Sequence, residues 1–261
     1  MKKLFFTFGM LFLGTAFHVH AQSLSPQVIA TSGGYYSNAA GSLSFTVGET
    51  VTPTITSGGY TLTQGFQQPF DLTIDLTAYL QGYYVGSGQM TDVLYNQGVY
   101  GSPSTVSDSV TIELHNATAP YALAFSTKKP IGQNGNINIK GLGAIGQQYY
   151  IVVKNRNHLE TWSANPVLLN SNTTYNFTNA ANKAYADNQV EVETGVFAMY
   201  SGDVNQDYSI DVFDYLEMDP DIVNGNSGYL STDTNGDGVV DVFDYILVDP
   251  NIVNGIGAAM P

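Results

Sequence analysis

A repeat close to the C-terminus constrains this chain more than any other feature of its sequence. DVFDYLEMDPDIVNG at residues 211–225 matches DVFDYILVDPNIVNG at residues 241–255, with a period of 30 residues. A repeat of this length is typical of a duplicated supersecondary unit. No lysine or arginine occurs after residue 200, whereas 12 of the 22 acidic residues do. The repeat and the change in charge predict a separate domain at residues 201–261.

Each copy of the repeat has oxygen-bearing residues at the spacing of a twelve-residue calcium-binding loop. In such a loop positions 1, 3 and 5 turn inward, position 7 offers its backbone carbonyl, and position 12 closes the site from the next helix. Oxygen donors without histidine or cysteine favour Ca²⁺ over zinc or copper. The predicted ligands of two calcium ions are Asp203, Asn205, Asp207, Ser209, Asp211 and Asp214 in the first loop (203–214), and Asp233, Asn235, Asp237, Val239, Asp241 and Asp244 in the second loop (233–244).

The two loops differ at position 6, where a glycine with positive φ normally stands. Tyr208 occupies this position in the first loop and Gly238 in the second. Because a bulky residue with positive φ costs roughly 1 kcal/mol or more, we expect the first loop to bind Ca²⁺ more weakly than the second. The apolar residues at position 8, Ile210 and Val240, are expected to meet in a short two-stranded bridge. Four mutually repelling carboxylates in each loop predict that this segment folds poorly without Ca²⁺.

The duplicated segment resembles a type I dockerin, the module that docks bacterial extracellular proteins onto cohesin domains. The opening GDVN at 202–205, the core NGDG at 235–238 and the aspartate at position 12 carry the resemblance, which covers about 55 of the 261 residues. The resemblance implies two Ca²⁺ ions and a cohesin-like partner that reads positions 10 and 11. These positions are Val212, Phe213, Val242 and Phe243, where the family usually has small hydroxyl residues, so the partner is left open.

Several alternatives remain for the repeat. Acidic runs of this kind also form solvated turns, because Asp, Asn and Gly favour turns. Phe213 and Phe243 either form a partner surface that is usable in two orientations or pack between the two copies or against the preceding domain. We expect core positions for Tyr215, Leu216, Tyr245 and Ile246. The Asp-Pro pairs at 219–220 and 249–250 are expected to end each helix after about two turns.

The composition excludes several classes of function. The formal net charge is −14, but only 11% of the residues are charged, and residues 1–200 carry a balance of only −2. Such an acidic chain does not provide the basic stripe that nucleic-acid binding requires. The sequence contains no cysteine, which rules out disulfides, thiol catalysis and Cys-ligated zinc.

Residues 71–200 carry most of the strand signal. Apolar residues alternate with polar ones at 72–80, 110–114, 137–139 and 190–192, and 149–153 is a continuous apolar run. Glycine and proline recur between these runs, which is typical of a β-sandwich of about seven strands. The order VTIELHN, YALAFSTKKP, GNINIKGL and YYIVVKNRNHL resembles the Ig-like or prealbumin-like sandwich, the type also found in carboxypeptidase regulatory domains.

The N-terminal region is expected to direct export and then to fold as a small β-meander. Two lysines and an apolar run at residues 4–17 read as a signal peptide over residues 1–21, with cleavage after Ala21. Short alternating runs separated by glycines predict the meander at residues 22–70. This segment resembles one that is common in exported bacterial proteins. We therefore expect a protein that is secreted or displayed at a bacterial cell surface, without a transmembrane segment.

No catalytic motif is present, and we predict no catalytic residues. His158, Glu160 and Trp162 lie close together in the sequence, but a strand edge with an exposed hairpin and a buried tryptophan explains them; His115 is expected in a loop. We therefore expect a mainly β, non-catalytic, calcium-binding protein whose C-terminal module docks to a partner or attaches to its own sandwich. The alternatives are an adhesion protein with an intramolecular calcium clip, and a carbohydrate-binding or carbohydrate-active accessory protein that binds polysaccharide through residues 71–200.

Overall fold

A computed structural model describes residues 32–38, 41–47, 55–57, 60–62, 72–99 and 101–261. The chain divides into two compact units, residues 1–69 and 70–261. The predicted signal peptide lies outside the described residues. The predicted boundary at residue 200 remains a prediction, and it falls inside the second unit. None of the described helices is long and apolar enough to cross a lipid bilayer.

The first unit contains two separate antiparallel hairpins in its described residues. Strand β1 (Ser32–Asn38) pairs with β2 (Gly41–Val47), and β3 (Ile55–Ser57) pairs with β4 (Tyr60–Leu62). The described strands of the two hairpins are not joined to each other. The expected β-meander is therefore replaced by a pair of hairpins over the residues that the structure describes.

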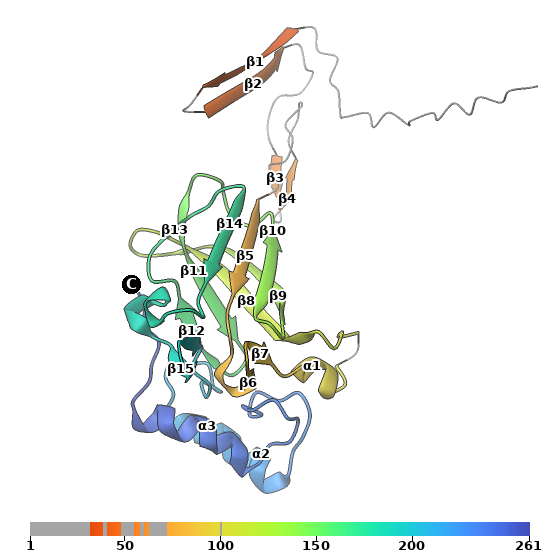
Figure 1. Ribbon diagram of the computed structural model, residues 1–261, viewed down its shortest axis with the longest axis vertical. Helices are drawn as coiled ribbons and strands as arrows, with labels where there is room; N and C mark the ends of the chain where they lie inside the picture. Colours follow the sequence, from red (N-terminus) through yellow and green to blue (C-terminus); the bar gives the residue numbers. More distant parts are fainter. Residues whose placement is uncertain (1–31, 39–40, 48–54, 58–59, 63–71, 100) are drawn as a thin grey trace, which may run out of the picture. The chain divides into compact units, whose positions relative to one another are not determined.

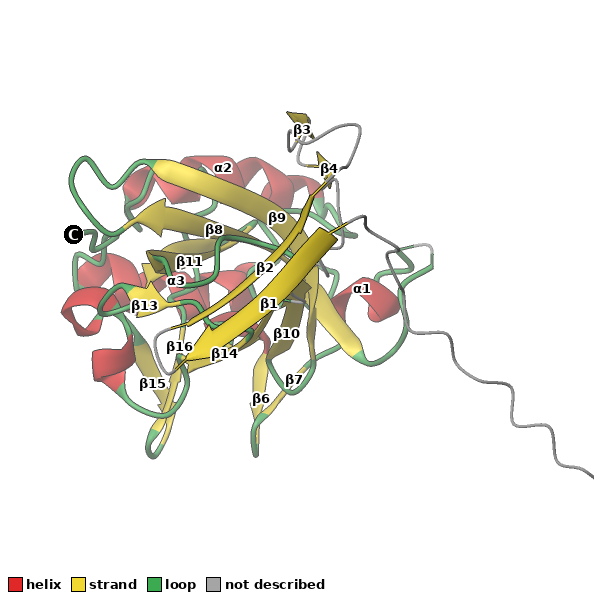
Figure 2. Cartoon of the chain, turned by 90° about the horizontal axis from the view of Figure 1, so that it is seen from above, coloured by secondary structure: helices red, strands yellow, loops and turns green. Residues whose placement is uncertain are grey.

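The second unit is built on two facing sheets (Figures 1 and 2). One sheet has the order β10-β5-β14, with β5 (Thr73–Thr77) between antiparallel β10 (Asn136–Lys140) and parallel β14 (Asn172–Asn176). The other has the order β12-β11-β8-β9, and its strands are β8 (Val106–Asn116), β9 (Leu123–Gly132), β11 (Gln148–Asn155) and β12 (His158–Trp162), with β13 (Val167–Leu168) also paired to β11.

A single apolar core lies between these sheets. Ile74 and Leu76 of β5 meet Ile112 of β8 and Ile151 of β11 in one buried cluster. Alternation of apolar and polar residues brings these side chains to the inner face, as a half-buried strand requires. The mainly β architecture and the sandwich are confirmed, and each predicted strand run lies in a strand or, for 72–80, contains one. Strand β14 was not predicted, because its sequence NTTYN is polar.

Small elements close the ends of the sandwich. They are η1 (Gln81–Tyr83), β6 (Tyr84–Gly86), β7 (Gln89–Met90), α1 (Val93–Asn96), η2 (Ala181–Lys183), η3 (Tyr185–Asp187), β15 (Val190–Glu193) and β16 (Val196–Ala198). The repeat follows with α2 (Val212–Asn224) and α3 (Val242–Val253), which lie at one end of the sandwich in Figure 1.

Helices α2 and α3 are longer than the expected two turns. They have 13 and 12 residues, and each contains its proline, Pro220 or Pro250, in the interior. The prediction that these prolines end the helices is wrong. Both prolines are exposed, as are the residues four positions earlier, Leu216 and Ile246, so water can hydrate the carbonyls that lose a helical partner.

A second, smaller core joins the repeat to the sandwich. Leu159 of β12 is buried together with Val204, Ile210, Met218 and Val248 of the repeat. The amide of Leu159 donates to the carbonyl of Tyr200 at 2.9 Å. The C-terminal segment therefore packs around a side chain that the sandwich supplies.

Candidate metal centre and docking face

The residues at position 9 of each loop begin the helices. Asp211 precedes α2 and accepts a hydrogen bond from the amide of Phe213 at 2.7 Å, and Asp241 does the same for Phe243 before α3. Each forms a capping box with the aspartate at position 12. A cap of this kind stabilises a helix by about 1 kcal/mol. The structure thus gives a helix-capping role to two of the predicted calcium ligands.

The position-12 residues, Asp214 and Asp244, are fully buried. In the first loop one carboxylate oxygen of Asp214 accepts from the amide of Val204 at 2.7 Å, and the other accepts from the amide of Asp211 at 2.8 Å. Asp244 makes the equivalent contacts with Thr234 and Asp241. These bonds close each loop onto the start of its helix.

The side chains at positions 1, 3 and 5 also turn into their loops. In the first loop Oδ1 of Asp203 accepts from the amide of Asp207 at 3.1 Å, and Nδ2 of Asn205 donates to Asp207 at 3.0 Å. Asn235 donates to Asp237 at 3.2 Å in the second loop. At position 7, Ser209 and Val239 donate their amides to the position-5 carboxylates.

The first loop holds buried negative charge without a cationic partner among the described ion pairs. Asp203 is 2% exposed and Asp214 fully buried. Burial, and next the charge of Asp214, raises the pKa of Asp203 to about 7. Burial also raises the pKa of Asp214. Across the described ranges, no three His, Asp or Glu side chains lie close enough together to hold a metal ion by themselves. The predicted donors of each loop are instead carboxylates, an amide oxygen and a backbone carbonyl, a mixture that suits Ca²⁺.

The second loop faces a cation that comes from the sandwich. Nη2 of Arg156, in the turn between β11 and β12, lies 4.0 Å from Oδ2 of Asp233. Burial raises the pKa of Asp233 to about 6, while Arg156 acts in the opposite direction and Asp244 raises it further. Gln97, which follows α1, also donates to this carboxylate. The first and second loops therefore have similar ligands but different surroundings.

Backbone conformation at positions 4 and 6 follows the same difference. Gln206 and Tyr208 have φ of 61° and 74°, and their counterparts Gly236 and Gly238 have φ of 76° and 87°. The expected positive φ of Tyr208 is confirmed, and its ring lies 5.5 Å from the ammonium of Lys154, which is within range of a cation–π contact. In the second loop a Cβ at position 236 would lie 2.6 Å from Val93 and 2.8 Å from Tyr83, so the sandwich leaves room only for glycine.

The two loops do not pair with each other. The amide of Ile210 donates to the carbonyl of Ile256 at 2.8 Å, and the amide of Val240 donates to that of Asn226 at 3.0 Å. The predicted bridge between Ile210 and Val240 is therefore wrong. Each loop pairs instead with the segment that follows the other copy's helix, because the copies are arranged head to tail around their shared core.

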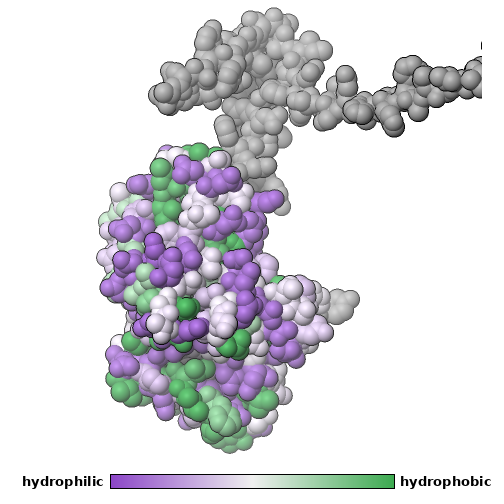
Figure 3. Space-filling model, in the orientation of Figure 1, coloured by the Kyte–Doolittle hydropathy of each residue, from purple (hydrophilic) through white to green (hydrophobic). Residues whose placement is uncertain are grey.

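Helices α2 and α3 present a symmetric apolar surface, which we call the docking face. It consists of Val212, Phe213 and Leu216 of α2 and Val242, Phe243 and Ile246 of α3, each between 58% and 62% exposed. Figure 3 shows hydrophobic residues gathered at this end of the molecule. Of the two alternatives for Phe213 and Phe243, packing inside is excluded, because both side chains are exposed. The core positions expected for Leu216 and Ile246 are wrong. Tyr215 and Tyr245 are half-buried and pack edge to face at 4.8 Å.

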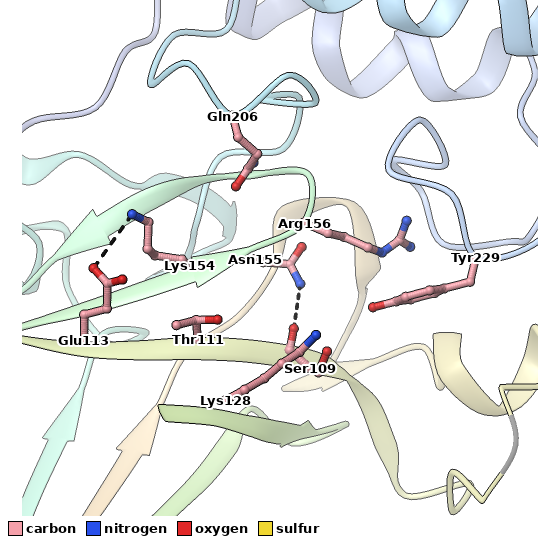
Figure 4. A pocket seen from close by; sticks show the side chains of 9 residues that line it. All are labelled: Ser109, Thr111, Glu113, Lys128, Lys154, Asn155, Arg156, Gln206 and Tyr229. Atoms are coloured by element: carbon pink, nitrogen blue, oxygen red, sulfur yellow. Dashed lines mark hydrogen bonds and ion pairs between the residues drawn. The ribbon is translucent and has the colours of Figure 1, made fainter. Parts of the chain in front are cut away.

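A cavity of about 290 Å³ lies where the first loop and the linker between the copies meet the sandwich (Figure 4). Lys128 and Lys154 line it from the five-stranded sheet, Gln206 from the first loop and Tyr229 from the linker. The cations are largely compensated, since Lys154 lies 2.8 Å from Glu160 and Nε of Arg156 lies 3.3 Å from Asp108. The cavity therefore has no strong preference for charge.

The histidine and tryptophan of the sandwich have structural roles. His158 is buried, its Nδ1 lies 2.9 Å from Oδ1 of Asn155, and burial lowers its pKa to about 3. Trp162 is buried as expected and donates to Glu160 at 2.7 Å, but the 155–158 hairpin is covered by the repeat and is not exposed. His115 lies in β8 rather than in a loop and stacks on Trp162 at 4.4 Å.

Sequence reasoning missed Arg156, its partner Asp108, and Gln97, which donates to Asp233. These residues lie more than 70 positions from the second loop, and no local motif connects them to it. One signal was available, since Arg156 is the sole arginine of the chain and lies in a turn rich in asparagine.

No family model matches this chain, and no curated protein matches it. Two solved structures of a type II cohesin–X-dockerin complex from Acetivibrio cellulolyticus are similar to it. A chain of the N-terminal interface mutant shares 17% identity with a TM-score of 0.43, over 69% of this chain and 95% of that chain. A chain of the C-terminal interface mutant shares 16% identity with a TM-score of 0.44, over 72% of this chain and 97% of that chain. Similarity at this level establishes neither the fold nor the partner of this protein.

Proposed function

We propose that this protein is a secreted, non-catalytic docking protein whose C-terminal repeat binds two Ca²⁺ ions and presents the docking face to another protein. The observation that carries the proposal is the duplicated apolar surface, which two acidic loops fix in nearly identical form on α2 and α3. Six large exposed apolar side chains on two adjacent helices are unusual for a soluble surface and are typical of an interaction site.

In each loop the proposed ligands are the residues at positions 1, 3, 5, 7, 9 and 12. The residue at position 9 would support the site indirectly, by capping the helix or through a water molecule. A bound Ca²⁺ would supply the positive charge that the buried carboxylates of the first loop lack. Asp214 and Asp244 would then hold both the metal and the first turn of their helices. Because Phe213 and Phe243 lie directly after the capping residues, the metal sites and the docking face share the same helical turns.

The partner that fits this surface has a flat apolar face, and the resemblance to dockerins points to a cohesin-like domain. The symmetry of the face allows the partner to engage α2 or α3 in either of two orientations. Val212, Phe213, Val242 and Phe243 would supply the central contacts. Large aromatic side chains often dominate the energy of such interfaces.

Titration with Ca²⁺ and with candidate partners tests the proposal. Calorimetry should give two sites in the full chain and one in each of Asp203→Ala and Asp233→Ala. Recombinant type I and type II cohesin domains serve as the protein probes. Phe213→Ala together with Phe243→Ala should weaken binding about 100-fold, while either alone should weaken it less than about 10-fold; Tyr95→Ala, an exposed aromatic outside the docking face, is the control.

Two results would contradict the proposal. If calorimetry shows no heat of Ca²⁺ binding, the proposed metal centre is wrong. If the double variant binds the cohesin domains as tightly as the wild type, the proposed role of the docking face is wrong. Dimerisation of the full chain that the double variant abolishes would assign the face to self-association instead.

A second candidate, an intramolecular clip, is favoured by the contact between the second loop and the sandwich. Nδ2 of Asn157 donates to the carbonyl of Asp233 at 2.7 Å, and Nδ2 of Asn251 in α3, the helix that follows the loop, donates to Oε1 of Gln81 in η1 at 2.9 Å. In this case the repeat would brace the sandwich, and the docking face would bind no partner. Cohesin binding by the wild-type chain separates the two candidates.

A further inference from the structure

The environment of Arg156 distinguishes the second loop from the first. The guanidinium lies between two carboxylates, with Nε 3.3 Å from Asp108 and Nη2 4.0 Å from Asp233. Its carbon atom is 4.2 Å from the centre of the Tyr229 ring, and the hydroxyl of Tyr229 donates to Asp108 at 2.5 Å. Asp108 and Asp233 are fully buried. The arrangement is therefore a desolvated network in which one cation serves two anions.

Arg156 is not fully engaged by this network. Both of its terminal nitrogens, Nη1 and Nη2, are buried and lack a hydrogen-bond partner among the described protein atoms. A buried donor without an acceptor costs about 1–3 kcal/mol, more when it is charged. A small movement toward Asp233 would form an ion pair with a direct hydrogen bond. The side chain is thus placed to bind Asp233 whenever that carboxylate lacks another cation.

Uncharged contacts hold the second loop against the same edge of the sandwich. Asn157 donates to the carbonyl of Asp233 at 2.7 Å. Gly82 of η1 lies so close to Thr234 that a Cβ on it would be 1.8 Å from the Thr234 carbonyl oxygen. Val204 and Ile210 of the first loop are buried with Leu159 of β12, but the residues between them have few comparable contacts. Tyr208 and Gln206 are exposed, and Tyr208 meets the sandwich through the distant approach of Lys154 to its ring. Loss of charge compensation therefore leaves the second loop anchored, whereas the exposed residues 206–208 leave the first loop free to open at its tip.

We propose that Arg156 is a built-in cation that keeps the second loop folded and attached to the sandwich when Ca²⁺ is withdrawn, so that calcium switches the first loop alone. This inference rests on the proposed calcium function. In the calcium-loaded protein, Asp233 serves the metal and Arg156 remains with Asp108. In the metal-free protein, Arg156 takes over Asp233. The α2 half of the docking face, which follows the first loop, then becomes the part that responds to calcium.

Hydrogen exchange on the full chain tests this asymmetry. In excess chelator, amide exchange should accelerate about 100-fold or more in residues 203–214 and less than about 10-fold in residues 233–244. In Arg156→Gln both loops should accelerate alike, while with Ca²⁺ present this variant should match wild type. Lys183→Gln, which removes another sandwich cation outside the network, is the control. Equal acceleration of both loops in the wild type would overturn the inference.

A mutant cycle in chelator gives a second measurement that does not depend on one variant alone. The effects of Arg156→Gln and Asp233→Asn on Tm should be strongly non-additive, because both remove the same pair. Arg156→Gln and Asp203→Asn should be additive, since the first loop does not contact Arg156. Should Arg156→Gln fail to fold in chelator, the single variants still decide: Asp203→Asn should raise Tm more than Asp233→Asn does, because Arg156 already compensates Asp233. An equal or larger rise in Asp233→Asn would overturn the inference. Chelator that changes neither loop would instead overturn the proposed calcium function.

Discussion

The first and second loops have the same spacing of acidic residues and yet occupy different physical environments. The first loop, with Tyr208 and Gln206 exposed, buries the carboxylates of Asp203 and Asp214, and neither forms an ion pair within the part of the chain that the structure describes. The second loop lies against the sandwich, where Arg156 and Gln97 approach Asp233. The spacing of the acidic residues alone therefore does not determine the energetics of such a loop. The surface on which the loop is packed contributes as well.

Residue choice at positions 4 and 6 follows this difference. Glycine is required at position 236 by contact with Val93 and Tyr83, whereas glutamine is tolerated at position 206, which faces the cavity of Figure 4. Both positions have positive φ, so the first loop accepts a conformational cost that the second loop avoids.

Withdrawal of Ca²⁺ should destabilise the second unit strongly. At a metal concentration about 1,000 times Kd, one site contributes about 4 kcal/mol, and 1 kcal/mol corresponds to about 2–4 °C for a domain of this size. We therefore expect chelator to lower Tm by about 10 °C or more and to reduce the helical signal in circular dichroism. An unchanged melting curve in chelator would mean that Ca²⁺ stabilises neither loop.

Substitution of the buried glycine should reveal which loop is packed. Gly236→Ala introduces a Cβ into the side chains of Val93 and Tyr83 at positive φ, so it should lower the free energy of unfolding by about 2–4 kcal/mol. Gln206→Ala at the same loop position should cost less than about 1 kcal/mol, mainly through its hydrogen bond to the carbonyl of Asp203. Chemical denaturation of both variants measures the difference. Equal costs would mean that the second loop is not held against the sandwich.

The metal-free protein should become less stable as the pH rises. The pKa of Asp203 is raised to about 7 and that of Asp233 to about 6, from an ordinary value of 3.8. The folded state therefore binds more protons than the unfolded state between about pH 4 and pH 7, and the free energy of unfolding falls as pH increases through that window. In chelator we expect Tm to drop by about 3–6 °C between pH 5.5 and pH 8. Asp203→Asn should remove more of this drop than Asp233→Asn, because charge repulsion is stronger in the first loop. The opposite order would mean that repulsion is stronger in the second loop.

Relief of the strained tyrosine should have the smallest effect. Tyr208→Gly removes a bulky side chain from a residue at φ 74°, and about 1 kcal/mol of relief would tighten Ca²⁺ binding by the first loop about 5-fold. Lys154→Met separates this relief from loss of the contact between Lys154 and the ring. Calorimetry at the first site measures both variants. Weaker binding by Tyr208→Gly would mean that the contact with Lys154 outweighs the strain.

The sequence predicted those features that depend on local pattern. Alternation of apolar residues located β5, β8, β10 and β15, because one buried face imposes a period of two, and a continuous apolar run located β11. The acidic spacing located both loops and the helices that follow them. The polar strand β14 was not predicted, because its pairing with β5 is a non-local interaction that its own residues do not indicate.

The features that were missed depend on contacts across long separations. Arg156 and Asp233 are 77 residues apart, and only packing of the repeat on β12 brings them together. The exposure of Leu216 and Ile246 was missed because apolar residues are assigned to a core by default. The length of α2 and α3 was missed because of where their prolines lie. On the exposed side of a helix, the carbonyl four positions before a proline can bond to water, and the sequence does not reveal which side is exposed.

Leu159 has a mechanical consequence. Its side chain belongs to β12 but is buried in the core of the repeat, and its backbone is hydrogen-bonded to Tyr200. A pull on α2 and α3 would therefore reach the five-stranded sheet through a buried side chain and a short backbone seam, not through a flexible tether. Tension would load β12 along its pairing with β11, a geometry in which several hydrogen bonds must break together. The repeat and the sandwich would bear force as one body.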